Sequence, residues 1–205
     1  YFLPTDYWAG NQLIIPGRGS EEMLLATQAN VPKPATGGPY PWVTASLTYF
    51  SCIPRQNAAG EGFLAIAADG TRYWFDWQSA YYESSLKKGN GTLSRRRVIL
   101  SATRVEDRFG NWVTYTYTNA SNGPARLASI QSSDSRVITV AYNAQGHVST
   151  VTANNRSWTY QYQYPTASTG SLTAVVLPDS SRWSINFAAL ADSKFRYHVI
   201  LASEE

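Results

Sequence analysis

The sequence predicts an all-β protein in which consecutive antiparallel β-hairpins form a curled, open β-sheet. Three observations support this fold class. Aromatic residues make up 14% of the 205 residues and charged residues only 15%. Aromatic and β-branched residues suit a pleated, half-buried surface, and Gly, Pro, Ser, Thr and Asn separate them here into short segments. Finally, one strand pattern recurs four times between residues 112 and 187.

The recurring pattern consists of three large apolar or aromatic residues that alternate with small polar ones. Each copy ends in an aromatic residue, and these residues are 25, 20 and 25 positions apart: Tyr117, Tyr142, Tyr162 and Phe187. Self-similarity at such a period is typical of stacked supersecondary units. We therefore expect residues 60–190 to form the hairpin repeats, between an N-terminal β and loop lead-in (1–59) and a C-terminal tail (191–205).

The lead-in reads as short strands separated by turns. Residues 11–15 are apolar and precede the turn-forming run 16–20. Residues 27–41 contain four prolines and predict an irregular loop, since Pro and Gly interrupt regular backbone. Residues 42–53 alternate well enough to predict one strand, which Pro54 would end.

The first repeat hairpin is predicted from residues 63–77, with Asp69-Gly70 at its turn. On the returning strand Tyr73, Phe75 and Trp77 would share one face, while Trp74 and Asp76 would point to the other, outward side. The polar residues 81–94 predict a loop, and residues 95–105 a further strand that leads into a turn at Gly110.

Three shorter strands between the aromatic ones carry apolar residues at a spacing of three instead of two. They are Leu127-x-x-Ile130, Val148-x-x-Val151 and Leu172-x-x-Val175. A β-bulge in each would explain this spacing. No helix is expected, because the best candidate, residues 188–194, covers barely two turns.

The stretch Tyr142-Asn-Ala-Gln-Gly146-His147-Val148 resembles the signature of the RHS or YD-repeat family, with Asn143 and His147 in place of the usual Asp and Arg. The run Glu106-Asp107-Arg-Phe-Gly110-Asn111-Trp112 resembles the same signature, with Glu in place of its Tyr. In this motif the glycine supplies a positive φ angle, the preceding Asp or Asn can bond the turn backbone, and the Tyr packs on the next hairpin.

The resemblance implies a non-enzymatic wall segment of a bacterial secreted or cell-surface protein that encloses or presents a toxin or effector domain. Its partners would be neighbouring RHS segments or an encapsulated C-terminal domain. A partial strip would leave open sheet edges, through which we expect self-association.

A carbohydrate-binding surface module is the main alternative, with Trp74 and Trp112 as candidates for stacking on sugars, including cell-surface glycans. A third reading is a glycosidase that uses two of Glu61, Asp69 and Asp76, since that chemistry needs a carboxylate pair. A β-propeller is a structural alternative, because 25 plus 20 residues approach the length of one blade.

Other functions find little support, and we assign no catalytic, cofactor-binding or metal-binding residue. His147 and His198 lack a spacing typical of metal ligands or a catalytic triad, and Cys52 in its alternating run predicts a buried, inert thiol. Lys87-Lys88 and Arg95-Arg96-Arg97 form the one basic cluster, which we interpret as a solvated strand end and not a nucleic-acid site. The glycosylation triplets at Asn90, Asn119 and Asn155 are expected by chance. No apolar run reaches the ~18 residues of a membrane span, and no signal-peptide pattern is visible.

Overall fold

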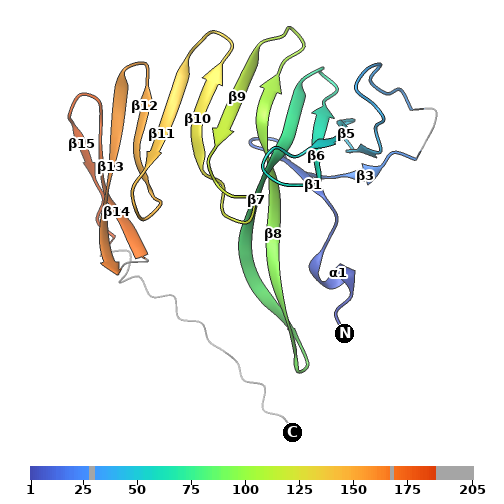
Figure 1. Ribbon diagram of the computed structural model, residues 1–205, viewed down its shortest axis with the longest axis horizontal. Coiled ribbons are helices and arrows are strands. Elements are labelled where there is room, and N and C mark those ends of the chain that lie inside the picture. The colour runs from blue at the N-terminus through green and yellow to red at the C-terminus, as the bar shows by residue number, and fades with distance from the viewer. Residues whose placement is uncertain (28–30, 167–168, 188–205) are drawn as a thin grey trace. The chain divides into compact units, whose positions relative to one another are not determined.

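The fold is all-β, as the sequence predicts. The computed structural model describes residues 1–27, 31–166 and 169–187, and the strands of these segments form one antiparallel sheet of 13 strands and a separate two-stranded hairpin (Figure 1). By its contacts the chain divides into two compact units, Tyr1–Ile138 and Thr139–Glu205. The expected C-terminal tail and the helix candidate at 188–194 lie outside the described residues.

The first unit contains one short helix, α1 (Pro4–Tyr7), and most of the strands. Its strands are β1 (Gln12–Ile15), β2 (Gly19–Glu22), β3 (Leu24–Leu25), β4 (Trp42–Val43), β5 (Tyr49–Pro54), β6 (Glu61–Ile66), β7 (Arg72–Lys88), β8 (Gly91–Glu106), β9 (Trp112–Tyr117) and β10 (Leu127–Ser132). At the boundary follows β11 (Val137–Tyr142), and the second unit contains β12 (Val148–Ala153), β13 (Arg156–Thr166), β14 (Thr169–Val176) and β15 (Arg182–Ser184).

Every strand of the large sheet pairs with its neighbours in the sequence, so the order runs from β15 at one edge to β3 at the other without a crossover. Short turns require this arrangement, because they can join only antiparallel neighbours. The sheet is open, and it does not divide into the four-stranded blades of a β-propeller. That alternative is wrong for the described part of the chain.

Five of the hairpin turns have the same geometry. In each, the first residue's N–H donates to the carbonyl of the fifth, and the fourth residue's N–H donates back to the first. The turns cover residues 67–71, 107–111, 132–136, 143–147 and 177–181. The fourth residue always has a positive φ angle: Gly70, Gly110, Ser135, Gly146 and Ser180. The three glycines predicted from the motifs are thus confirmed as turn residues, and the two serine copies extend the repeat.

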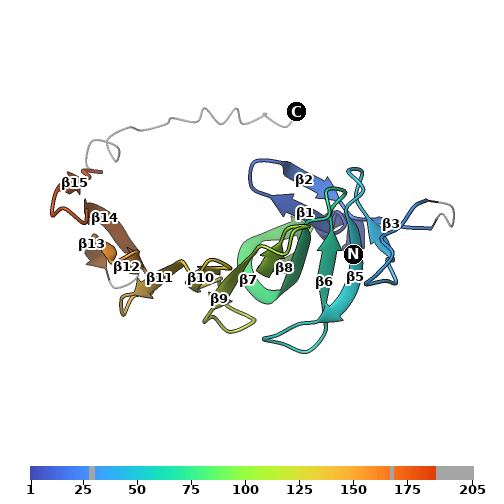
Figure 2. The same ribbon diagram turned by 90° about the horizontal axis from the view of Figure 1, so that it is seen from above.

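The hydrophobic core of the first unit lies on one face of its sheet. Leu13 of β1 and Met23 pack with Phe50 of β5 and Ala65 of β6, so the β1–β2 hairpin covers this face (Figure 2). Phe63, Tyr73 and Phe75 lie against the same cluster, and the rings of Tyr73 and Phe75 stack with centroids 5.8 Å apart. The predicted inward face of β7 is therefore confirmed for these two residues.

Two predictions about the strands are wrong. Residues 81–94 are not a loop: they form the outer halves of β7 and β8, which pair from Tyr81↔Arg97 to Lys88↔Gly91. Polar residues form strands here because they pair with each other across a turn at Gly89 and Asn90. Residues 42–53 are not one strand, because the chain turns between β4 and β5 with Leu47 at positive φ, and Val43 then pairs with Tyr49.

The predicted bulges are present in two of the three short strands. The pairing register shifts across Ala128 in β10 and across Thr173 in β14. Each bulge adjoins the residue that lies opposite the repeat aromatic of the partner strand: Leu127 pairs with Tyr117, and Leu172 with Tyr162. The spacing of three in the sequence thus marks an extra residue in the strand.

Candidate functional site

A concave polar site of the first unit lies where β7 and β8 are both interrupted by bulges. The register passes from Trp74↔Arg104 to Phe75↔Ala102 and then to Trp77↔Ser101, which leaves Asp76 and Thr103 without a partner in the ladder. Bulges re-aim side chains in this way. Gly62 of β6 permits the distortion, since a Cβ atom there would lie 2.7 Å from the Phe75 carbonyl oxygen.

The two bulge residues bond each other. The Thr103 hydroxyl donates to Asp76 Oδ1 at 2.6 Å, and Gln56 Nε2 donates to Asp76 Oδ2 at 2.9 Å. Asp76 is only 5% exposed. The prediction that it points outward along a regular strand is wrong, because the bulge turns its carboxylate into a buried hydrogen-bond network.

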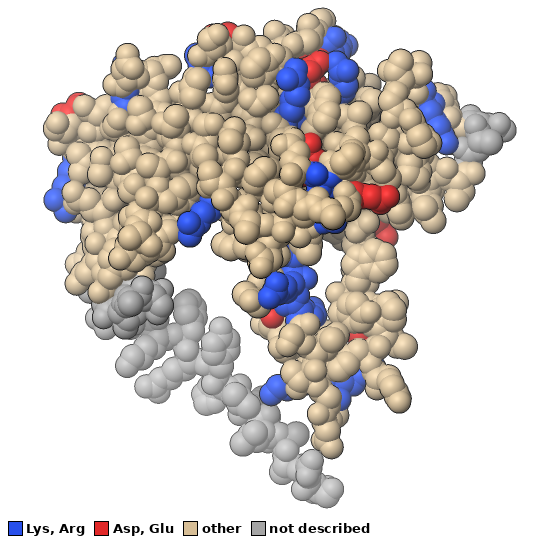
Figure 3. All heavy atoms as spheres, in the orientation of Figure 1, with Lys and Arg blue, Asp and Glu red and all other residues tan. Residues whose placement is uncertain are grey.

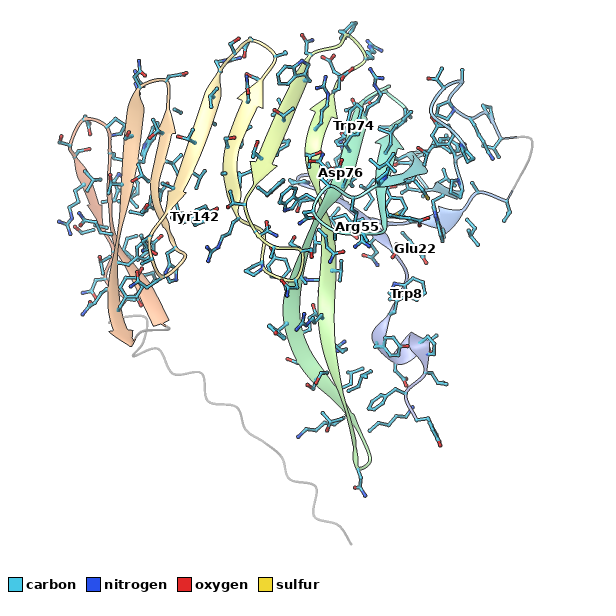
Figure 4. The ribbon with its side chains drawn as sticks, in the orientation of Figure 1. Trp8, Glu22, Arg55, Trp74, Asp76 and Tyr142 are labelled. Carbon is cyan, nitrogen blue, oxygen red and sulfur yellow. The ribbon has the colours of Figure 1, made fainter. Side chains whose placement is uncertain are left out.

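A cavity of about 310 Å³ opens beside this network. Trp74, Arg104, Thr114 and Tyr115 line it together with Gln56, Asp76 and Thr103. Figure 4 shows Trp74 and Asp76 following each other along β7. The size is at the lower limit for small-ligand sites, and the lining combines one large ring with several hydrogen-bonding groups.

The two predicted sugar-stacking residues lie on either side of one guanidinium group. Arg104 Cζ is 5.6 Å from the Trp74 ring centroid and 5.0 Å from that of Trp112. Arg72 also lies over Trp74, at 5.8 Å. Glu106 fixes both arginines, since its carboxylate accepts from Arg104 at 2.7 Å and pairs with Arg72. Cation–π contacts therefore occupy these rings, and a sugar would compete with them.

Two of the three carboxylates considered for glycoside hydrolysis, Glu61 and Asp69, lie at opposite ends of β6. Glu61 begins β6 and Asp69 lies in the turn after its end, so a whole strand separates them. Asp69 Oδ1 accepts the Thr71 N–H at 2.9 Å, which lowers the pKa of Asp69. It acts as a turn residue.

The repeat aromatics use their hydroxyl groups within the sheet. Tyr117 donates to the Ala102 carbonyl at 3.0 Å, and Tyr162 donates to the Val148 carbonyl at 2.8 Å. Each bond reaches the adjacent strand that precedes the tyrosine in the sequence: β8 for Tyr117 and β12 for Tyr162. Burial raises the pKa of Tyr117 to about 12. Tyr142 occupies the same repeat position (Figure 4), and Phe187 lacks the hydroxyl and is exposed.

A polar cluster in the second unit was not predicted. Asn143 Nδ2 donates to the Tyr164 hydroxyl at 2.6 Å, and His147 Nδ1 lies 3.1 Å from the same oxygen. The His147 ring also contacts Tyr162, with centroids 5.0 Å apart. His147 thus packs against β13, the strand that follows its own hairpin, while His198 lies outside the described residues. The sequence marks Asn143 and His147 as motif positions, but it does not show that Tyr164, two residues beyond the repeat aromatic, meets both.

Two further residues differ from the sequence interpretation. Cys52 is exposed, not buried, because it lies beyond the part of β5 that the core covers. Partial desolvation and the nearby Glu61 charge raise the pKa of its thiol. Asn119 is buried and fully bonded: it accepts from Trp77 Nε1 and the Arg126 N–H, and donates to the Gln78 carbonyl. It is a structural residue and offers no free amide for glycosylation.

The described residues contain no group of three His, Cys, Asp or Glu side chains placed to hold a metal ion. The helix α1 spans four residues, too few to cross a bilayer. The described segments contain no helix that is long and apolar enough to do so. A comparison of the sequence with models of known families finds no match, and a search of curated proteins finds no relative. The RHS resemblance therefore stays a prediction from the motifs.

Proposed function

We propose that this chain is a non-enzymatic wall segment of an RHS-repeat secreted or surface protein, and that it encloses or presents a toxin or effector domain. The observation that carries the proposal is the uniform hairpin strip. Five turns share one hydrogen-bond pattern, and the strands between them pair only with their neighbours in sequence. Such a strip can be lengthened by adding hairpins, which is what a wall requires.

The use of polar groups supports a structural role. In four of the five turns an Asp or Asn oxygen accepts a backbone N–H at 3.1 Å or less, and two repeat tyrosines bond backbone carbonyls. Asp76, the most buried carboxylate, is bonded to Thr103 and Gln56. These groups stabilise the strip and are already engaged.

The test is electron cryomicroscopy of the full product of the reading frame that contains this sequence, combined with limited proteolysis. We expect a closed shell whose wall includes residues 60–187, and a domain inside it that resists protease until the shell is denatured. An extended strip with solvent on both faces and no protected domain would contradict the proposal.

A carbohydrate-binding module remains the second candidate, favoured by the cavity beside Trp74. We expect any glycan that binds there to lose affinity about tenfold or more in a Trp74→Ala variant, because a stacked ring and its cavity wall are removed. Trp112→Ala is the matched control: that ring also contacts Arg104 but does not line the cavity. A glycan array without binding would remove this candidate, and equal loss in both variants would remove the cavity as the place where the glycan binds.

A further inference from the structure

The outer halves of β7 and β8 form a two-stranded arm that extends beyond the rest of the first unit. We call residues 82–97 the β-arm. The adjacent strands pair only with the inner halves: β6 reaches Phe75, and β9 pairs as far as Arg104. The last contact of the β9–β10 loop is with Tyr81. At about 3.3 Å per residue, Tyr82 to Lys88 extends roughly 20 Å further (Figure 1).

The net positive charge of the protein comes from the β-arm. It has five basic residues, Lys87, Lys88, Arg95, Arg96 and Arg97, and one acidic residue, Glu83, which gives a net charge of +4. The whole chain has a net charge of +3, so all its other residues together have −1. Figure 3 shows basic side chains along this projection.

Contacts within the arm leave most of this charge without a counterion. Glu83 pairs with Arg97 at 3.4 Å, and Asp6 pairs with Lys88 at 3.2 Å. Arg96 Cζ instead lies 4.6 Å from the Tyr82 ring centroid, and Arg95 donates to the Ser84 carbonyl, so neither contact is with an acidic group. An anionic partner would therefore find a strong field here.

Exposed apolar side chains accompany the charge. Residues 2–8 lie beside the arm, since Asp6 bonds Lys88 and the Phe2 ring lies against Gly91. Leu3, Tyr7 and Trp8 of this segment are exposed, as are Tyr82 and Val98 on the strands. Figure 4 labels Trp8. Tyr82 is 83% exposed. Exposed apolar side chains that lie near a basic segment are suited to a surface that is both apolar and anionic.

We propose that the β-arm and residues 2–8 dock this protein on an anionic lipid bilayer as a peripheral contact, without spanning it. Trp and Tyr rings are favoured at the headgroup level, and Lys and Arg are attracted to lipid phosphates. A two-stranded β-ribbon also fits the DNA major groove. Phosphate contacts alone, however, would give no reason to expose Leu3 and Val98 beside the charges.

The test is co-sedimentation of the purified protein with vesicles of phosphatidylglycerol and phosphatidylcholine, compared with vesicles of phosphatidylcholine alone. We expect binding only to the anionic vesicles. Raising NaCl from about 0.1 to 1 M should reduce it strongly, because the Debye length falls from about 10 to about 3 Å. Binding of equal strength to both vesicle types, or to neither, would overturn the proposal.

Matched variants locate the contact. Lys87→Gln with Arg96→Gln should weaken vesicle binding roughly 30-fold, at about 1 kcal/mol for each charge near the surface. Arg156→Gln with Arg182→Gln removes the same charge from exposed positions of β13 and β15 and should change binding less than twofold. Trp8→Ala should also weaken binding, whereas Trp183→Ala, which removes another exposed Trp, should not.

Two outcomes would assign the arm another role. Binding to a DNA duplex that is lost in the Lys87/Arg96 variant, with no vesicle binding, would indicate a nucleic-acid site. If that variant aggregates and the wild-type protein does not bind vesicles, the charges serve to prevent pairing at the arm's open edges. Either result would overturn the bilayer proposal. Circular dichroism of each variant confirms that the strands are formed.

Discussion

Four of the five equivalent hairpin turns have one Asp or Asn side chain that accepts backbone N–H groups at 3.1 Å or less, and it takes one of two places. In the turns 107–111 and 143–147 it is the first residue: Asp107 and Asn143 each accept the N–H groups of the third and fifth residues. In the turns with Asp69 and Asp179 it is the third residue, which accepts the N–H of the fifth. The fifth residue's N–H is therefore bonded in both kinds of turn.

The fourth turn residue gives a paired stability prediction. Gly110→Ala should lower the free energy of unfolding by about 1 kcal/mol, because its φ of 87° is unfavourable for a residue with a Cβ atom. No atom lies within 4 Å of the added Cβ, so the cost is conformational. Ser135→Gly should have the opposite effect at a φ of 68°. Urea unfolding measures both, and a change of the same sign in both would contradict the explanation.

Asp107 gives a pH prediction. Hydrogen bonds from Asn111 and from the turn N–H groups lower its pKa from the ordinary 3.8. The unfolded chain therefore takes up the proton first, so the stabilisation is complete above about pH 4 and is lost as the pH falls through the lower, folded-state pKa. Asp107→Asn should keep the turn, as Asn143 does in its own copy. Its stability should fall less steeply than that of the wild type between pH 5 and pH 2.5. Equal slopes in denaturant unfolding would contradict this prediction.

At the scale of elements, the β9–β10 loop connects strands that are far apart in the sequence. The Gly123 carbonyl accepts the Ala80 N–H, Ser121 accepts from Gln78, and Asn119 bonds Trp77. The Trp77 ring stacks on Tyr117 with centroids 5.8 Å apart. The loop thus covers β7 at the base of the arm and fixes where the arm begins.

Replacing Asn119 should therefore be costly. Asn119→Ala should lower the free energy of unfolding by about 2 kcal/mol, because Trp77 Nε1 loses its acceptor in a partly buried place, whereas the Gln78 carbonyl keeps the bond from Asn57. Asn122→Ala in the same loop is the control, since Asn122 is exposed. Thermal or urea unfolding provides the measurement, and equal effects of the two substitutions would show that the network contributes little.

At the scale of the whole molecule, the buried core is unevenly distributed. Among the described residues, all buried hydrophobic side chains except Ala174 belong to the first unit. Stability against local opening follows the density of buried contacts. We expect hydrogen exchange to be slowest in β5, β6 and the inner half of β7, and at least tenfold faster in β12 to β14. Uniform protection across both units would contradict this expectation.

The open sheet predicts association. Its edge strands β3 and β15 expose Leu25 and Trp183, the latter at 69%. Unpaired strand edges with apolar side chains favour pairing with another chain. Light scattering should show a mass that increases with concentration, and Leu25→Lys or Trp183→Lys should reduce the increase. A monomer at high concentration would argue against accessible edges.

The sequence alone determined the fold class, the turn glycines and two of the bulges. These features follow from local rules: alternation with a period of two defines a strand, a positive φ requires Gly or a tolerant residue, and a spacing of three marks an extra residue. The alternation along residues 73–77 also predicts that Trp74 points away from Tyr73 and Phe75, and Trp74 lines the cavity. Its role in stacking on a sugar stays a prediction.

The roles of Asp76, Asn119 and residues 81–94 follow from tertiary contacts between segments that are separated in the sequence. Asp76 meets Thr103 and Asn119 meets Trp77 across 27 and 42 positions of sequence. Such contacts depend on the register between strands, which a bulge changes without a clear local signal. The β-arm was not predicted either, because its polar residues form strands only by pairing with each other.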